Sequence, residues 1–290
     1  MKHLAFFLIF LLLICFFSGC AAQAPADIAA TTLPVYTFTE RLCEGTPLTV
    51  TRLVTESVSC LHDYTLQVSQ MRAIQGAKAV VISGAGLEEF LEDALHSANH
   101  IIDASHSLSL MEGEHYDHDH HGHTHASDPH IWLSPENAKV MAHNICHSLE
   151  EVFPQYASVF EENLHKLEAD LDALQTYGEE TLASLSCREL ITFHDGFSYF
   201  AESFDLTILK AVEEESGSEA SAAQLKELCR MIENHHLPAI FIETNGSESA
   251  ANIIAVETGV KVFTLDMAMS GEDYFAILYR NIDIIKEALQ

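Results

Sequence analysis

Three histidines that lie far apart in the chain stand where metal ligands are expected. His130 lies between two prolines, whose rings hold the backbone around the imidazole rigid. His194 directly follows the apolar run 190–193, and His62 lies in a loop just past the apolar run 48–54. Neutral imidazole nitrogens bind Zn²⁺ and related metals. The positions indicate metal ligation, and the alternative for each residue is an ordinary surface or turn histidine.

A carboxylate completes a possible ligand set. Asp266 follows the run 262–265 as His194 follows its own run, and open α/β sheets bind ligands outside the carboxyl ends of their strands. Three imidazoles and one carboxylate suit four-coordinate Zn²⁺ at ~2.0 to 2.2 Å, whereas Mn²⁺ and Ca²⁺ prefer more oxygen. Glu243 or a water are the alternatives for the fourth ligand. The carboxylates that could hold a second ring N–H, unless they are simply solvated, are Asp63 and Asp195.

One low-complexity segment, 112–127, is rich in histidine and aspartate and is expected to be a mobile loop. Its six histidines are His115, His118, His120, His121, His123 and His125. They could bind additional zinc, sense it or pass it to the main site. The alternative is a solvated linker, because flexible imidazoles lose entropy when they are ordered around a metal.

The elements that must position these residues alternate between strand and helix patterns. Such alternation predicts βαβ units, mostly parallel sheets and an α/β fold with two lobes. The predicted strands are 27–33, 48–54, 79–83 and 101–103 in the first lobe, and 189–193, 207–212, 239–243 and 262–265 in the second. A helix is predicted at 222–234, and Ser134 and Pro135 could serve as N-cap and first residue of another.

A long amphipathic helix is predicted over 155–185. This stretch contains no proline, and apolar residues recur in it at steps of three and four. Its length favours a connector between the lobes over an ordinary helix of one domain. We therefore expect a signal segment at 1–19, an N-terminal lobe at 20–154, the linking helix at 155–185 and a C-terminal lobe at 186–290.

Composition narrows the functional classes. The 290 residues are 48% hydrophobic and carry a formal net charge of -29, which suits a globular protein and disfavours nucleic acid as a partner. An acidic field suits a cationic ligand, although solubility alone also explains it.

The N-terminus predicts export. Lys2 precedes an apolar stretch at 4–17, which is shorter than the ~20 residues needed to span a bilayer as a helix. Phe17-Ser18-Gly19-Cys20 resembles a bacterial lipobox, in which Cys20 would carry the lipid. With Cys15 removed in the signal segment and Cys20 lipidated, five of the seven cysteines remain. An odd number cannot all pair, and no Cys-x-x-Cys spacing occurs. Most are expected to be small buried hydrophobes, with one disulfide possible.

Several motifs together resemble one family. The segments that carry the resemblance are Leu61-His62-Asp63-Tyr64, Asp128-Pro129-His130-Ile131-Trp132-Leu133-Ser134-Pro135, Phe193-His194-Asp195-Gly196-Phe197-Ser198-Tyr199-Phe200 and Thr264-Leu265-Asp266. They are similar to the zinc/manganese cluster of substrate-binding proteins of ABC transporters, especially the ZnuA-like zinc receptors. The resemblance covers essentially the whole mature length.

The resemblance implies a ligand set and an architecture. Residues that match His62, His130 and His194 bind the metal in that family, and a carboxylate at or near Asp266 often completes the shell. Manganese-binding members usually carry glutamate where this chain has His194, so histidine implies zinc. The implied fold is two (β/α)4-like lobes bridged by one long rigid helix. The chain departs from the family at Ser134, where aspartate is frequent, and at 267–270, where Pro-Leu-Gly is common.

The function expected from these observations is an extracytoplasmic, lipid-anchored Zn²⁺ receptor, a monomer that serves the permease and ATPase of an ABC importer. Manganese or iron(II) uptake, or a surface adhesin with a structural metal, are the alternatives. An enzyme is not expected, because neither a His-Glu-x-x-His nor a Gly-x-Ser-x-Gly motif is present.

Overall fold

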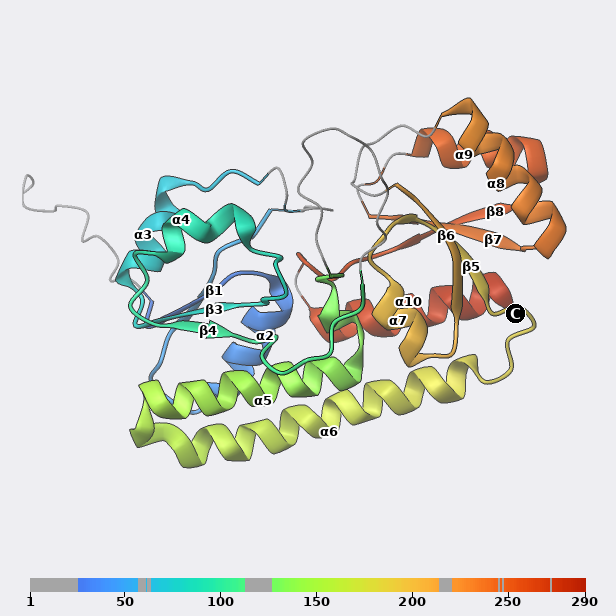
Figure 1. Ribbon diagram of the computed structural model, residues 1–290. Helices are drawn as coiled ribbons and strands as arrows, with labels where there is room; N and C mark the ends of the chain where they lie inside the picture. Colours follow the sequence, from blue (N-terminus) through green and yellow to red (C-terminus); the bar gives the residue numbers. More distant parts are fainter. Residues whose placement is uncertain are drawn as a thin grey trace, which may run out of the picture.

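Two lobes lie side by side along one long helix (Figure 1). The computed structural model describes residues 26–56, 61, 64–112, 127–213, 221–244, 246, 248–271 and 273–290. Each lobe contains a four-stranded sheet in which every pairing is parallel. The predicted two-lobed α/β fold is therefore confirmed.

The N-terminal sheet has the strand order β2-β1-β3-β4. Its strands are β1 (Ile28–Ala30), β2 (Val50–Arg52), β3 (Ala79–Ile82) and β4 (Ile101–Asp103). The helices of this half are α2 (Leu33–Leu42), α3 (Val68–Gly76), η1 (Glu89–Leu91), α4 (Glu92–Leu95), η2 (Ile131–Leu133) and α5 (Pro135–Val152). The β1 and β3 strands are mostly buried apolar residues, as expected for a sheet covered on both faces.

The predicted strand at 27–33 is shorter in the structure. It ends at Ala30, and α2 begins at Leu33 with a proline in its first turn. The hydroxyl of Thr31 donates to Glu88 Oε1 at 2.7 Å, and the hydroxyls of Thr32 and Ser83 lie 3.0 Å apart. Buried side-chain hydrogen bonds thus hold a tight strand-to-helix turn where the apolar pattern alone suggested a continuing strand.

The C-terminal sheet repeats the arrangement, with the order β6-β5-β7-β8. Its strands are β5 (Glu189–His194), β6 (Thr207–Glu213), β7 (Ala239–Glu243) and β8 (Lys261–Leu265), and its helices are α7 (Ser198–Ser203), α8 (Ala222–His235), α9 (Glu248–Thr258) and α10 (Tyr274–Leu289). Each predicted strand in this half agrees with the observed one to within a residue at either end. The two sheets share one connection pattern, so in each the carboxyl edge carries the loops that can form a site.

The predicted long helix is present as α6 (Ala157–Leu182), preceded by the short turn η3 (Pro154–Tyr156). It buries an apolar stripe that includes Phe160, Leu167 and Leu174. The α6 helix packs against α5 and α2 of the N-terminal half and against α10 of the C-terminal half. A Cβ on Gly178 would lie 2.1 Å from the ring of Phe204, so the absence of a side chain there lets α6 approach the C-terminal lobe closely.

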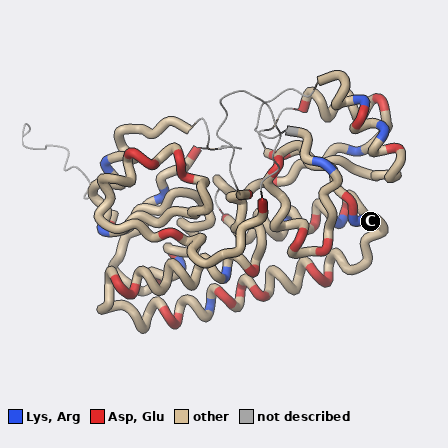
Figure 2. Tube along the Cα trace, viewed as in Figure 1, with Lys and Arg blue, Asp and Glu red and all other residues tan. Residues whose placement is uncertain are grey.

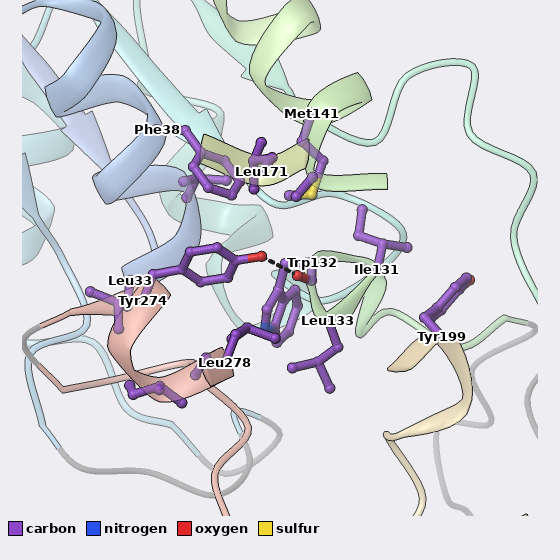
Figure 3. Packing of buried hydrophobic residues seen from close by; sticks show 14 of the residues in the cluster. Leu33, Phe38, Ile131, Trp132, Leu133, Met141, Leu171, Tyr199, Tyr274 and Leu278 are labelled. Carbon is purple, nitrogen blue, oxygen red and sulfur yellow. Dashed lines mark hydrogen bonds between the residues drawn. The ribbon is translucent and has the colours of Figure 1, made fainter. Parts of the chain in front are cut away.

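The largest of three hydrophobic clusters among the described residues extends from one lobe into the other. Trp132 and Tyr274 are fully buried in it. The Tyr274 hydroxyl donates to the Trp132 carbonyl at 2.6 Å, as Figure 3 shows, and the Trp132 indole donates to the Met267 carbonyl at 2.7 Å. Behind the strand ends, therefore, the lobes are joined by packing and by hydrogen bonds.

Acidic residues outnumber basic ones, 43 to 14. Their positions are spread over both lobes and along α6 (Figure 2). None of the helices that the structure describes is long and apolar enough to span a membrane. The four cysteines in the described ranges, Cys43, Cys146, Cys187 and Cys229, are free thiols, and the first two are buried. Burial raises the pKa of Cys43 and of Cys146 to about 12.

Candidate metal-binding site

His130 lies in the turn that leads into η2 and α5, and its imidazole is held by Asp128. The Asp128 Oδ1 accepts the His130 backbone N–H at 2.9 Å and lies 2.8 Å from Nδ1. Burial alone would raise the pKa of Asp128, but the hydrogen bonds and charge interaction with His130 lower it below its ordinary value. In the neutral ring, Nδ1 is then the donor and Nε2 keeps its lone pair for a metal.

His194 is the last residue of β5, and its imidazole meets that of His130. The two Nε2 atoms are 3.4 Å apart, and the rings cross at 87° with their centroids 5.2 Å apart. His130 is 7% exposed and His194 is 3% exposed. Two Zn–N bonds of ~2.0 to 2.1 Å that meet at the tetrahedral angle place their nitrogens ~3.3 Å apart. The pair therefore already has the spacing of two ligands on one zinc ion.

Gly196 makes the meeting of the two rings possible. A Cβ on this residue would lie 2.9 Å from His130 Nδ1, 2.9 Å from His194 Cδ2 and 2.5 Å from Met267 Cε. Real Cβ atoms essentially never approach neighbours at any of these three distances. The backbone at 196 thus closes one side of the histidine pair, together with the methyl group of Met267.

Asp266 follows β8 but makes other contacts. Its Oδ2 lies 3.4 Å from Arg280 Nη2 and from Thr244 Oγ1, and its Oδ1 accepts the Ala268 N–H at 2.9 Å. Within the described part of the chain, no group of three or more His, Cys, Asp or Glu side chains converges closely enough to hold a metal. The role of Asp266 as a metal ligand therefore stays a prediction.

Glu243, the alternative fourth ligand, ends β7 beside β5. The sheet register pairs Thr192 with Phe241, so Glu243 and His194 stand at the same level on adjacent strands. The Glu243 side chain is buried, and a Cβ on Gly246 would lie 2.5 Å from its carboxyl group. Its position at the carboxyl edge keeps it a candidate.

Several predicted residues fall outside the described residues. These are His62, Asp63, the lipidation residue Cys20 and the six histidines His115, His118, His120, His121, His123 and His125. Two residues near His62 are described: Tyr64 N–H donates to the Leu61 carbonyl at 3.0 Å. The predictions for the residues outside the described ranges stay predictions.

The partner of the His130 ring is Asp128. The sequence pattern had suggested Asp63 and Asp195 for such a role and did not point to Asp128. Asp195 is half-buried next to His194. The signal that could have found Asp128 is its position two residues before His130, from which a short side chain can reach the backbone N–H of the second residue on.

The fold and the histidine pair define a class: a two-lobed α/β binding protein with a candidate metal site between its lobes. Contacts such as the Leu33 N–H to the Met269 carbonyl, at 3.0 Å, and Arg52 Nη1 to the Gly271 carbonyl, at 2.7 Å, join the carboxyl edges of the two sheets.

Comparisons with known proteins identify the family. The model of the family "ZnuA: Zinc-uptake complex component A periplasmic" matches residues 28–288. The chain therefore belongs to this family. A crystal structure of ZnuA is 30% identical, with a TM-score of 0.79 over 91% of this chain and 100% of the other.

Two curated relatives are similar to this chain in sequence. The zinc-binding lipoprotein AdcA of Streptococcus pneumoniae serotype 4 is 29% identical over 94% of this chain, and the chain spans 58% of AdcA. A putative metal-binding protein of Treponema pallidum is also 29% identical, over 93% of this chain and 92% of the relative. The structure of Zn(II)-bound AdcA has a TM-score of 0.76 at 27% identity, over 91% of this chain and 57% of AdcA.

Proposed function

We propose that the chain is an extracytoplasmic receptor that binds Zn²⁺ between its lobes and delivers it to an ABC importer. The observation that carries the proposal is the 3.4 Å separation of the His130 and His194 Nε2 atoms, which suits two ligands of one tetrahedral zinc ion. The burial of both rings supports the same proposal, because it limits competition from water.

Two further ligands would complete the shell. His62 is the proposed third ligand, and Asp266, Glu243 or a water is the fourth. A set dominated by imidazole favours Zn²⁺ over Mn²⁺, which prefers oxygen ligands. The six histidines of segment 112–127 are proposed as an auxiliary zinc site that is not needed for tight binding between the lobes.

The proposal includes a location and partners. Residues 1–19 would be removed, Cys20 would carry the lipid that holds the receptor at the membrane, and the permease and ATPase of an importer would take up the metal from the monomer. The proposed units are a lobe at 20–154, the linking helix at 155–185 and a lobe at 186–290. A net charge of -29 suits a cationic cargo. No catalytic role is proposed.

Competition with a chelator of known zinc affinity tests the proposal. We expect tight one-to-one binding of Zn²⁺ and weaker binding of Mn²⁺. His194→Ala should weaken zinc binding by more than the ~10- to 100-fold that loss of an outer-shell partner costs. Deletion of 114–125 should remove additional weak sites and leave the tight one.

A matched control is His165→Ala on α6, because this histidine is exposed and its Nδ1 lies 3.4 Å from Glu168 Oε2, away from the proposed ligands. It should bind zinc like the unchanged protein. Equal affinities of the His194 and His165 variants would refute the proposed site, and tighter binding of Mn²⁺ than of Zn²⁺ would refute the proposed cargo.

A further inference from the structure

The hydroxyl of Tyr199 lies at a junction between the lobes. Tyr199 extends from α7, five residues after His194 (Figure 3), and is 1% exposed. Its hydroxyl accepts the Met111 N–H at 2.9 Å and donates to the Asp128 carbonyl at 3.0 Å. The Asp128 N–H in turn donates to the Met111 carbonyl at 3.0 Å. One buried hydroxyl from the C-terminal lobe thus closes a ring of three hydrogen bonds with the N-terminal half.

This ring continues directly to the imidazole. Asp128 contributes its backbone to the ring and its Oδ1 to both the backbone N–H and Nδ1 of His130. A displacement of the Asp128 backbone would therefore move the carboxylate that orients the His130 ring. Because the groups are buried, water cannot easily replace a lost partner.

The other end of the same turn is also tied to the C-terminal lobe. Trp132, two residues after His130, donates from its indole to the Met267 carbonyl and accepts the Tyr274 hydroxyl at its own carbonyl. The turn that bears His130 is thus held on both sides by the lobe that supplies His194.

We propose that Tyr199 is a positioning residue that holds Asp128 and His130 from the C-terminal lobe and so makes His130 and His194 one preassembled pair. The proposal rests on the proposed function, because it assumes that this pair binds zinc. In this arrangement the two imidazoles stay together if the lobes shift, and the metal is released by loss of the remaining ligands. The hydroxyl also fixes both ends of segment 112–127 beside His130, because Met111 and Asp128 flank that segment.

The test is Tyr199→Phe, which keeps the ring and removes only the hydroxyl. We expect its zinc dissociation constant to rise about tenfold, as for other outer-shell partners. The absorption spectrum of bound Co²⁺ should also change, since a reoriented His130 alters the ligand geometry. The control is Tyr177→Phe, which removes an exposed hydroxyl that donates to Asp283 at 2.6 Å and should change neither quantity.

A double-mutant cycle separates positioning from a general loss of stability. If Tyr199 acts through His130, Tyr199→Phe should have little further effect on the weaker zinc binding of His130→Ala. An undiminished effect in that background, or unchanged affinity and Co²⁺ spectrum in Tyr199→Phe alone, would overturn the inference. If the unchanged protein binds zinc no better than His194→Ala, the proposed function fails instead.

Discussion

The carboxylate of Asp128 accepts two hydrogen bonds from His130, one from the backbone N–H at 2.9 Å and one from Nδ1 at 2.8 Å. A single oxygen atom thereby fixes both the position of the turn and the orientation of the ring. The ring's other nitrogen, Nε2, faces His194.

Asp128→Asn is expected to weaken zinc binding by about tenfold without unfolding the protein. The amide oxygen still accepts hydrogen bonds, but the negative charge that strengthens the imidazole as a donor to the metal is lost. Chelator competition measures the change. Asp172→Asn is the matched control, because this exposed carboxylate of α6 pairs with Lys139 of α5 at 2.6 Å. Similar zinc affinities in the Asp128 and Asp172 variants would contradict the role given to Asp128.

Gly196→Ala is expected to weaken zinc binding and to lower the free energy of unfolding by about 1 to 3 kcal/mol, the usual range for overpacking. The added methyl group would press on Met267 and on both imidazoles. Zinc titration and urea unfolding measure the two effects.

The double variant Gly196→Ala, Met267→Ala tests the cause of that effect. It removes the nearest obstacle, which lies 2.5 Å from the new Cβ. Zinc affinity should recover in part relative to Gly196→Ala alone. If the affinity of the single variant equals that of the unchanged protein, the close approach at 196 is not what aligns the rings.

Much of the framework was predictable from sequence, and the reasons are local. His194 ends an apolar run, so its place at the carboxyl edge of a strand follows from the pattern and is confirmed by β5. The long helix was predictable because its apolar stripe and lack of proline extend over many turns. Its first residues form a 3-10 turn instead, since Pro154 starts a new element there.

Contacts between distant segments were less accessible. Nothing in the spacing of Met111, Asp128 and Tyr199 shows that one hydroxyl joins them, because the contact depends on how α7 packs against the other half of the molecule. Buried polar contacts of this kind are specified by tertiary packing, whereas strand and helix patterns are specified by periodicity. Asp266 is a second example. The strand pattern predicted its position at the end of β8, but it did not predict that its carboxylate would lie 3.4 Å from Arg280.

Glu88 is expected to make stability depend on pH near neutrality. Burial raises the pKa of this carboxyl group from 4.5 to about 7, against the opposing effect of hydrogen bonds from Thr31, Ser83 and Gly84. The folded state therefore binds the proton more tightly than the unfolded state. Its contribution to stability is complete below about pH 4.5 and is lost as the pH rises through about 7.

Urea unfolding between pH 5 and pH 8 measures this contribution by difference. Glu88→Gln cannot titrate, so the loss of about 2 to 3 kcal/mol with rising pH should disappear in this variant. Its stability at pH 5 should be lower than that of the unchanged protein, because the amide nitrogen cannot accept the Gly84 N–H, which Oε2 accepts at 3.0 Å. Glu161→Gln, at an exposed position of α6, should retain the full slope; a parallel pH profile in Glu88→Gln would show that another group is responsible.

Trp132→Phe is expected to weaken both the junction between the lobes and the metal site. The indole N–H is the donor to the buried Met267 carbonyl, and the indole ring lies 5.4 Å from the His130 ring, measured between centroids. Phenylalanine keeps most of the apolar contact but leaves the carbonyl without this donor, which costs about 1 to 3 kcal/mol, and leaves a small cavity in addition. Unfolding of this variant is measured by circular dichroism, because the substitution removes the only tryptophan and with it the tryptophan fluorescence signal.

The paired measurement is zinc affinity, since a loosened turn should hold His130 less firmly. The comparison is Tyr274→Phe, which removes the hydroxyl that donates to the Trp132 carbonyl at 2.6 Å and keeps the indole in place. If Trp132→Phe and Tyr274→Phe both lower stability and weaken zinc binding to a similar extent, the two hydrogen bonds act together on the turn. A Trp132→Phe variant as stable as the unchanged protein would contradict the junction, because a buried carbonyl cannot lose its donor without a penalty unless water reaches it.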